Sequence, residues 1–122
     1  MKQLAFESMV RGLQYHAIGK GLVTDVELGE PVKLMAEPTN PYDDQAIQVM
    51  LDRPDGLVMI GYIPKELTYK VHPLLALEGI ITLVSHTQLP KFMTVAVYVE
   101  GTPPTTEDTV KPEFDGTPEI DV

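Results

Sequence analysis

The chain has 122 residues, of which 18 are acidic and 9 basic, so its formal net charge is −9 at pH 7. This length suits one domain, and an apolar fraction of 43% can build a single core. The acidic balance argues against a generally basic nucleic-acid binder, and the absence of cysteine excludes disulfides, thiolate nucleophiles and cysteine-dependent zinc sites. No stretch approaches the ~20 apolar residues of a membrane-spanning helix, and the N-terminus lacks the apolar core of a signal peptide, so we expect a soluble, cytoplasmic protein.

The chain divides into two parts of different composition. Residues 1–100 hold nearly all the apolar side chains and are predicted to form the folded domain. Residues 101–122 contain four prolines, five threonines and six acids against one lysine, a net charge of −5. Such a segment cannot offset the entropy of ordering it, which favours an acidic, disordered tail. The alternative is an acidic peptide that binds a partner or covers the domain's own binding site.

The first hundred residues have mostly the pattern of β-strands. Apolar residues at alternating positions from Leu13 onward predict a strand over residues 8–18, ended by Gly19. Later strands are predicted at residues 31–37, 46–51, 57–63, 80–88 and 92–99. Residues 53–56, Arg-Pro-Asp-Gly, have the chemistry of a tight turn, so strands 46–51 and 57–63 should form a hairpin.

Short helices are expected after the hairpin. Pro64 is well placed as the first residue of a helix that continues to Val71. We expect His72-Pro73 to interrupt it, and Pro73 to begin a second short helix that ends at Gly79. About six strands with one or two short helices predict a mostly β fold, a small barrel or sandwich.

The densest polar cluster is residues 37–45, Glu-Pro-Thr-Asn-Pro-Tyr-Asp-Asp-Gln, between two predicted strands. One interpretation is structural: an Asx-type turn at Asn40, with Asp43 capping the backbone that follows. The other is functional: a rigid loop that presents the phenol of Tyr42 and the carboxylate of Asp43 to a ligand. Spacing alone favours the structural interpretation.

Catalytic and metal-binding patterns are not evident in the sequence. None of the three histidines has a metal-ligating partner three or four residues away. There is no nucleophile elbow, P-loop or dinucleotide fingerprint, so we predict no catalytic residue, no metal and no cofactor. A nuclease that uses Asp43 and Asp44 with a divalent ion is the enzymatic alternative, but two adjacent acids without further carboxylates make a poor two-metal site.

Four motifs together resemble a known family. They are Val-Arg-Gly-Leu-Gln-Tyr at 10–15, Val-Lys-Leu at 32–34 with Glu-Pro at 37–38, Asn-Pro-Tyr-Asp at 40–43 with Ala-Ile-x-Val at 46–49, and Ile-Gly-Tyr-Ile-Pro-Lys at 60–65. In this order and spacing, from about Met9 to Val99, they resemble the HIRAN domain. The resemblance implies a modified OB-like β-barrel with short helices.

The resemblance also implies a function. In fork-remodelling DNA translocases the HIRAN domain is a non-catalytic module that captures the 3′-hydroxyl end of single-stranded DNA. In bacteria and phages it also occurs as a free-standing domain, and this chain looks like that kind. The implied partners are a single-stranded DNA 3′ end and a helicase or nuclease, in DNA repair or replication-fork processing.

Individual residues match positions with roles in the family. Tyr15 matches an aromatic that packs against the terminal nucleotides, while Tyr42 and Asp43 match the loop that meets the 3′-hydroxyl. Lys65 matches a phosphate contact. Phe92 matches a second stacking aromatic, through an alignment that crosses a variable loop.

Two positions depart from the family pattern. Gln14 stands where DNA-binding members carry a basic residue, and Tyr62 stands where a histidine touches phosphate. Each lost contact weakens binding and flattens its salt dependence. The first hundred residues carry a charge of −4. An alternative function is therefore a protein-interaction adaptor of a DNA-processing system that has lost strong DNA affinity.

Overall fold

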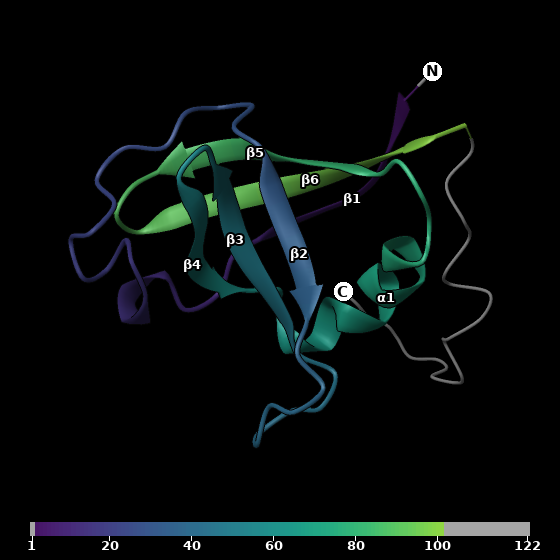
Figure 1. The fold of residues 1–122 in the computed structure, drawn as a ribbon, viewed down its shortest axis with the longest axis horizontal. Helices are drawn as coiled ribbons and strands as arrows, with labels where there is room; N and C mark the ends of the chain where they lie inside the picture. Colours follow the sequence, from purple (N-terminus) through teal and green to yellow (C-terminus); the bar gives the residue numbers. More distant parts are fainter. Residues whose placement is uncertain (1, 102–122) are drawn as a thin grey trace.

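The computed structural model describes residues 2–101, so the predicted tail, apart from its first residue, lies outside the described part of the chain. The described residues form six strands, two 3₁₀ turns and one α-helix (Figure 1). In chain order these are β1 (Lys2–Met9), η1 (Leu13–Tyr15), β2 (Val32–Ala36), β3 (Ile47–Arg53), β4 (Gly56–Tyr62), η2 (Lys65–Leu67), α1 (Thr68–Leu75), β5 (Ile81–Gln88) and β6 (Phe92–Glu100).

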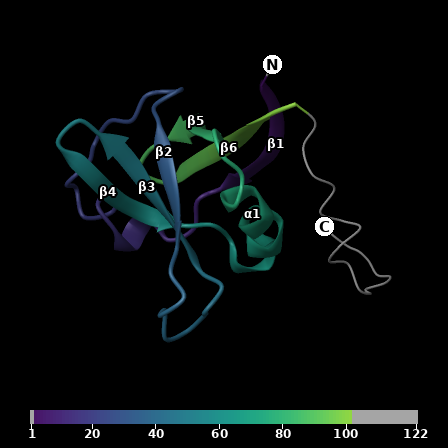
Figure 2. The same ribbon diagram turned by 45° about the vertical axis from the view of Figure 1, so that its right-hand side comes forward.

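The strands form two antiparallel three-stranded sheets, in the orders β1-β6-β5 and β2-β3-β4. Figure 1 shows one sheet lying across the other, and Figures 1 and 2 show α1 at one end of the sandwich. The mostly β fold, the number of strands and the β3–β4 hairpin are as predicted. Within the described residues only the isolated bridges Arg11↔Tyr62 and Pro31↔Leu83 join the two sheets at their edges, so the barrel is not closed.

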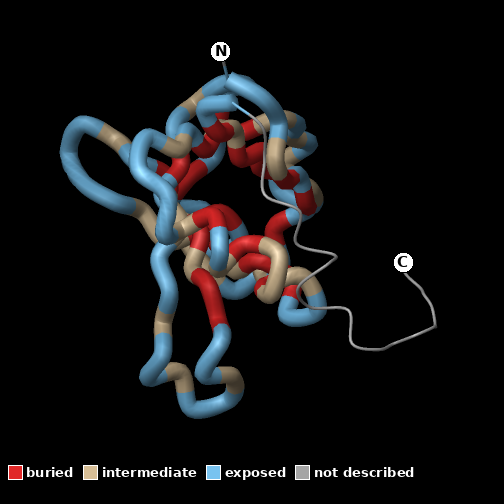
Figure 3. The backbone as a smooth tube through the Cα atoms, turned by 90° about the vertical axis from the view of Figure 1, so that its right-hand side faces the viewer, coloured by how far each residue is buried: buried red, intermediate tan, exposed pale blue. Residues whose placement is uncertain are grey.

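The core lies between the inner faces of the two sheets. Ile47, Val49 and Leu51 alternate along β3 and are completely buried, as are Met93 and Val95 on β6. Burial of each such side chain contributes about 1.5–3 kcal/mol. Figure 3 shows the buried residues in red along the backbone tube.

The N-terminal strand lies earlier than the sequence pattern suggests. β1 covers Lys2–Met9, and the predicted strand over residues 8–18 is wrong, since its centre is the 3₁₀ turn η1. Gly12 adopts a left-handed φ of 83°, which ends extended structure there. Pairing of β1 with β6 along its whole length stabilises the earlier segment as the strand.

The helical segment also differs from the prediction. Pro64 precedes η2 rather than starting it, and α1 runs through Pro73 without a second helix. Burial of Val71 and Leu74 against the core outweighs the one backbone hydrogen bond that Pro73 cannot donate. Gly79, at φ 75°, lies in the connection to β5.

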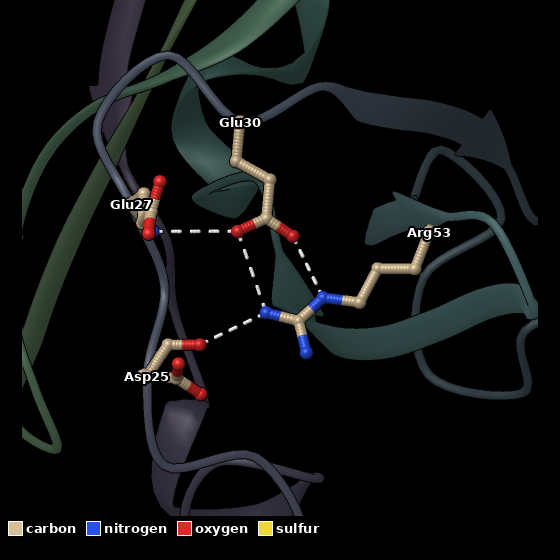
Figure 4. A network of polar contacts seen from close by, with 4 residues as sticks. All are labelled: Asp25, Glu27, Glu30 and Arg53. Carbon is tan, nitrogen blue, oxygen red and sulfur yellow. Dashed lines mark hydrogen bonds and ion pairs between the residues drawn. The ribbon is translucent and has the colours of Figure 1, made fainter.

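An ion pair fastens the connection between η1 and β2 to the β3–β4 hairpin (Figure 4). Arg53 Nε donates to Glu30 Oε2 at 2.7 Å, and Arg53 Nη2 donates to the backbone oxygen of Asp25 at 2.9 Å. The backbone oxygen of Glu30 also accepts from the Val84 N–H on β5 at 2.9 Å. The hydrogen bond from Arg53 is the main cause that lowers the pKa of Glu30. This cluster therefore connects both sheets at one edge of the sandwich.

Candidate nucleic-acid interface

Tyr15 lies on the η1 turn rather than on a strand. Leu13, at the start of the turn, is buried and anchors it in the core. The Tyr15 side chain is 68% exposed. Its ring is therefore accessible to a nucleic-acid base, and such stacking is typically worth about 1–3 kcal/mol per base.

The loop between β2 and β3 is organised by Asn40. The side-chain oxygen of Asn40 accepts hydrogen bonds from the backbone N–H groups of Tyr42 (2.8 Å) and Asp43 (3.0 Å). Its side-chain nitrogen donates to Glu37 Oε1 at 2.9 Å. The predicted Asx turn is thus confirmed. Figure 3 shows the loop as a protrusion that is mostly exposed.

The tip of this loop presents a phenol and a carboxylate. Tyr42 is 90% exposed. Asp43 Oδ1 accepts the backbone N–H of Gln45 at 2.9 Å, so the predicted capping role is also confirmed. Within residues 2–101 no hydrogen bond to Asp43 Oδ2 is found. That oxygen can accept a hydrogen bond from a ligand hydroxyl while Oδ1 keeps the loop in shape.

Tyr62, at the end of β4, connects the η1 turn to the β2–β3 loop. Its ring lies 5.8 Å from that of His16, and its hydroxyl donates to Glu37 Oε1 at 2.8 Å. Hydrogen bonds from Asn40 and then Tyr62 lower the pKa of Glu37, whereas burial and the contact with Glu37 raise the pKa of Tyr62. The sequence assigned no role to His16 or Glu37, because only the fold brings them to Tyr62.

Gly61 allows the two segments to approach closely. A Cβ atom at this position would lie 2.4 Å from the backbone oxygen of Arg11 and 2.6 Å from Val10 Cγ1. Arg11 and Tyr62 exchange backbone hydrogen bonds of 2.8 and 2.9 Å beside this contact. The glycine of the Ile-Gly-Tyr-Ile-Pro motif therefore places Tyr62 next to the segment that leads into η1.

Lys65 begins η2, three residues after Tyr62, and is exposed. The neighbouring Glu66 forms an ion pair with Arg11, whose Nη2 lies 2.7 Å from Glu66 Oε2, and not with Lys65. In the part of the chain that the structure describes, Lys65 has no ion pair, so its charge is available to a ligand.

The turns that carry Gln14 and Phe92 lie next to each other. Gln14, Gly19, Pro90 and Lys91 line an open hollow of about 400 Å³ between η1 and the β5–β6 turn. Phe92 follows Lys91 and is half-buried, with its ring edge-on to His86 at 5.4 Å. Lys91 was not singled out from the sequence, where it is one turn residue next to an aromatic.

Metal-binding geometry is absent from the described residues. Among residues 2–101 no group of three or more His, Asp or Glu side chains is placed to hold a metal ion. Asp43 and Asp44 therefore gain no third ligand there. No helix in the same part of the chain is long and apolar enough to cross a membrane.

Comparison with known proteins identifies the family. The sequence model of the HIRAN domain matches residues 3–102. The chain belongs to the HIRAN domain family. The crystal structure of the HIRAN domain of human HLTF is similar to this HIRAN domain, with 27% identity and a TM-score of 0.55 over 80% of this chain and 77% of that one. A crystal structure of a protein from Lactobacillus plantarum shares the fold at 22% identity, with a TM-score of 0.63 over 80% and 94% of the two chains.

A search of curated proteins found no match to the chain. HIRAN domains are known as DNA-binding modules and not as catalytic domains. Nucleic acid is therefore the class of partner that family membership supports, and the residues described above are the candidates for contacting it.

Proposed function

We propose that this HIRAN domain binds the 3′-hydroxyl end of single-stranded DNA without catalysing a reaction on it. The observation that carries the proposal is Asp43, whose Oδ1 accepts the Gln45 N–H while Oδ2 accepts no hydrogen bond from residues 2–101. A carboxylate oxygen accepts a hydrogen bond from a terminal hydroxyl. The same charge repels a phosphate in that position, which excludes a 3′-phosphate or a continuing strand.

The surroundings of Asp43 fit a chain end better than a continuous backbone. Glu37 and Asp44 add two more carboxylates to the same loop, so the loop is unfavourable for phosphate. The hydrogen bonds of Asn40 order the loop before a ligand arrives, which lowers the entropy cost of binding.

Stacking and a few cations supply the remaining contacts. The exposed rings of Tyr15 and Tyr42 are the proposed stacking surfaces, Phe92 is a further one, and Lys65 is the proposed phosphate contact. Gln14 and Tyr62 are proposed to line the interface as neutral groups. Stacking accepts any base, so we expect little sequence preference.

The decisive experiment compares two oligonucleotides of the same sequence, one ending in a 3′-hydroxyl and one in a 3′-phosphate. Fluorescence anisotropy at low salt should show about tenfold tighter binding of the hydroxyl end, the value of one hydrogen bond to a charged group. Equal binding of the two ends, or no binding of either, would overturn the proposal.

Matched variants assign the preference to one side chain. Asp43→Asn keeps an oxygen for the Gln45 N–H but removes the charge, so it should abolish the preference for the hydroxyl end. Asp44→Asn makes the same chemical change one residue away and should retain the preference. Lys65→Ala should weaken the binding of both oligonucleotides by the same factor, because it removes a phosphate contact and not the contact with the chain end.

A protein-interaction adaptor is the second candidate function. It is supported by the charge of −4 on residues 1–100 and by the Tyr62 hydroxyl, which is already donated to Glu37. Recovery of a defined helicase or nuclease with the purified chain, together with no retention of DNA, would support the adaptor over end binding. A role in DNA repair or replication-fork processing is compatible with both end binding and the adaptor function.

A further inference from the structure

We propose that Lys91 binds a backbone phosphate of the nucleic-acid strand in the hollow between η1 and the β5–β6 turn. This inference rests on the proposed binding of single-stranded DNA and names a contact that the sequence motifs do not include. The hollow is open to solvent, and its volume of about 400 Å³ is within the range of ligand sites.

The charge of the hollow fits a phosphate. Of its four lining residues, Lys91 is a cation and none is acidic. Lys20 directly follows Gly19, another lining residue, and does not itself line the hollow. The β2–β3 loop, by contrast, carries several carboxylates. The phosphates and the chain end would therefore contact different parts of the interface.

Lys91 is available for such a contact. Both arginines of the domain are already paired, Arg11 with Glu66 and Arg53 with Glu30. The exposed side chain of Lys91 makes no hydrogen bond or ion pair with any of residues 2–101. Its backbone N–H donates to the Gln88 oxygen at 3.1 Å, which holds its main chain in the turn.

The positions of two aromatic residues indicate how a strand would reach Lys91. Tyr15 follows Gln14 and Phe92 follows Lys91, so an aromatic residue comes directly after a lining residue on each side of the hollow. Bases stacked on such rings leave the phosphodiester backbone running beside them, where a lysine acts as a point-charge partner. Lys91 thus offers the positive charge that the neutral amide of Gln14 cannot.

The test measures how DNA affinity depends on salt. Labelled single-stranded oligonucleotides are titrated by anisotropy at several salt concentrations with the wild type, Lys91→Ala and Lys33→Ala. Lys33 is an exposed lysine on β2 that does not line the hollow, so it is the matched control. Lys91→Ala should weaken binding about two- to fivefold at low salt and reduce the slope of log K against log salt by about 0.7. Lys33→Ala should match the wild type in DNA affinity and in the slope.

A rescue variant adds a second criterion. Gln14→Lys in the Lys91→Ala background should restore the lost slope, because both residues line one hollow. A wild-type slope for Lys91→Ala, while Tyr15→Ala still loses affinity, would overturn the Lys91 contact and leave DNA binding standing. A reduced slope with equal affinity for 3′-hydroxyl and 3′-phosphate ends would support Lys91 and reject end recognition. A wild type that binds no DNA would overturn both proposals.

Discussion

Replacing Gly61 with alanine should damage stability and DNA binding together. The new Cβ would lie 2.4 Å from the Arg11 backbone oxygen and 2.6 Å from Val10 Cγ1, closer than real Cβ contacts. Backbone cannot rotate away as a flexible side chain does, so the Val10–Arg11 segment and β4 must separate.

The structure sets the size of the effect. The two backbone hydrogen bonds between Arg11 and Tyr62 measure 2.8 and 2.9 Å. An opening of about 0.6 Å would stretch them to about 3.4–3.5 Å, beyond the usual N–H···O range. Two lost hydrogen bonds at about 1 kcal/mol each, partly offset by the lower chain entropy of unfolded alanine, should reduce the free energy of unfolding by about 1–2 kcal/mol, and strain in a packed site can add to this.

The assay is urea unfolding followed by DNA titration under conditions where each variant is folded. Gly21→Ala is the matched control: apart from its two chain neighbours, no described residue has an atom within 4 Å of the new methyl group, and its φ is 77°. It should lose about 1 kcal/mol from the left-handed backbone alone and keep its DNA affinity. Gly61→Ala should also bind DNA more weakly, since Tyr62 shifts relative to η1. Wild-type stability and affinity of Gly61→Ala would refute the close-approach argument.

Three further outcomes are expected. Because the hydrogen bond from Arg53 lowers the pKa of Glu30, the ion pair stabilises the fold above the ordinary pKa of a glutamate and this stability is lost as the pH falls through the lowered value. In urea unfolding at several acidic pH values, the free energy of unfolding should fall less steeply with decreasing pH for Arg53→Met than for the wild type. Identical pH profiles of the two proteins would contradict this. Thr87→Val should raise the free energy of unfolding by about 1 kcal/mol, because the buried Thr87 hydroxyl has no hydrogen-bond partner within the described residues; a loss of stability would reveal a missed partner. Deletion of residues 101–122 should leave the melting temperature unchanged, and tighter DNA binding by the truncated chain would show that the tail competes with the ligand.

The β2–β3 loop was the part of the candidate site that could be inferred from sequence. Asn40-Pro41 and Asp43 are local turn signals, and their hydrogen bonds reach only two or three residues along the chain. Nothing local revealed the hollow, because Gln14 and Lys91 are far apart in sequence and meet only when η1 packs beside the β5–β6 turn.

The η1 region shows why alternation alone misleads. Tyr15 belongs to an apolar/polar alternation that a strand would also show, but the left-handed Gly12 turns the chain before it. The result is a tyrosine on an exposed turn rather than on a sheet face, which changes what it can contact.

By itself, the sequence determined the mostly β class, the β3–β4 hairpin, the Asx turn and the family, since these depend on short-range patterns and motif order. Tertiary structure decided which segment became β1, how α1 passes through Pro73, and which distant residues share one surface. Tertiary structure also decided where the charges lie relative to the candidate interface. The net −9 counts every residue equally, whereas a ligand responds to nearby charges. The carboxylates of the β2–β3 loop and Lys91, which has no ion pair with residues 2–101, lie in different parts of the fold.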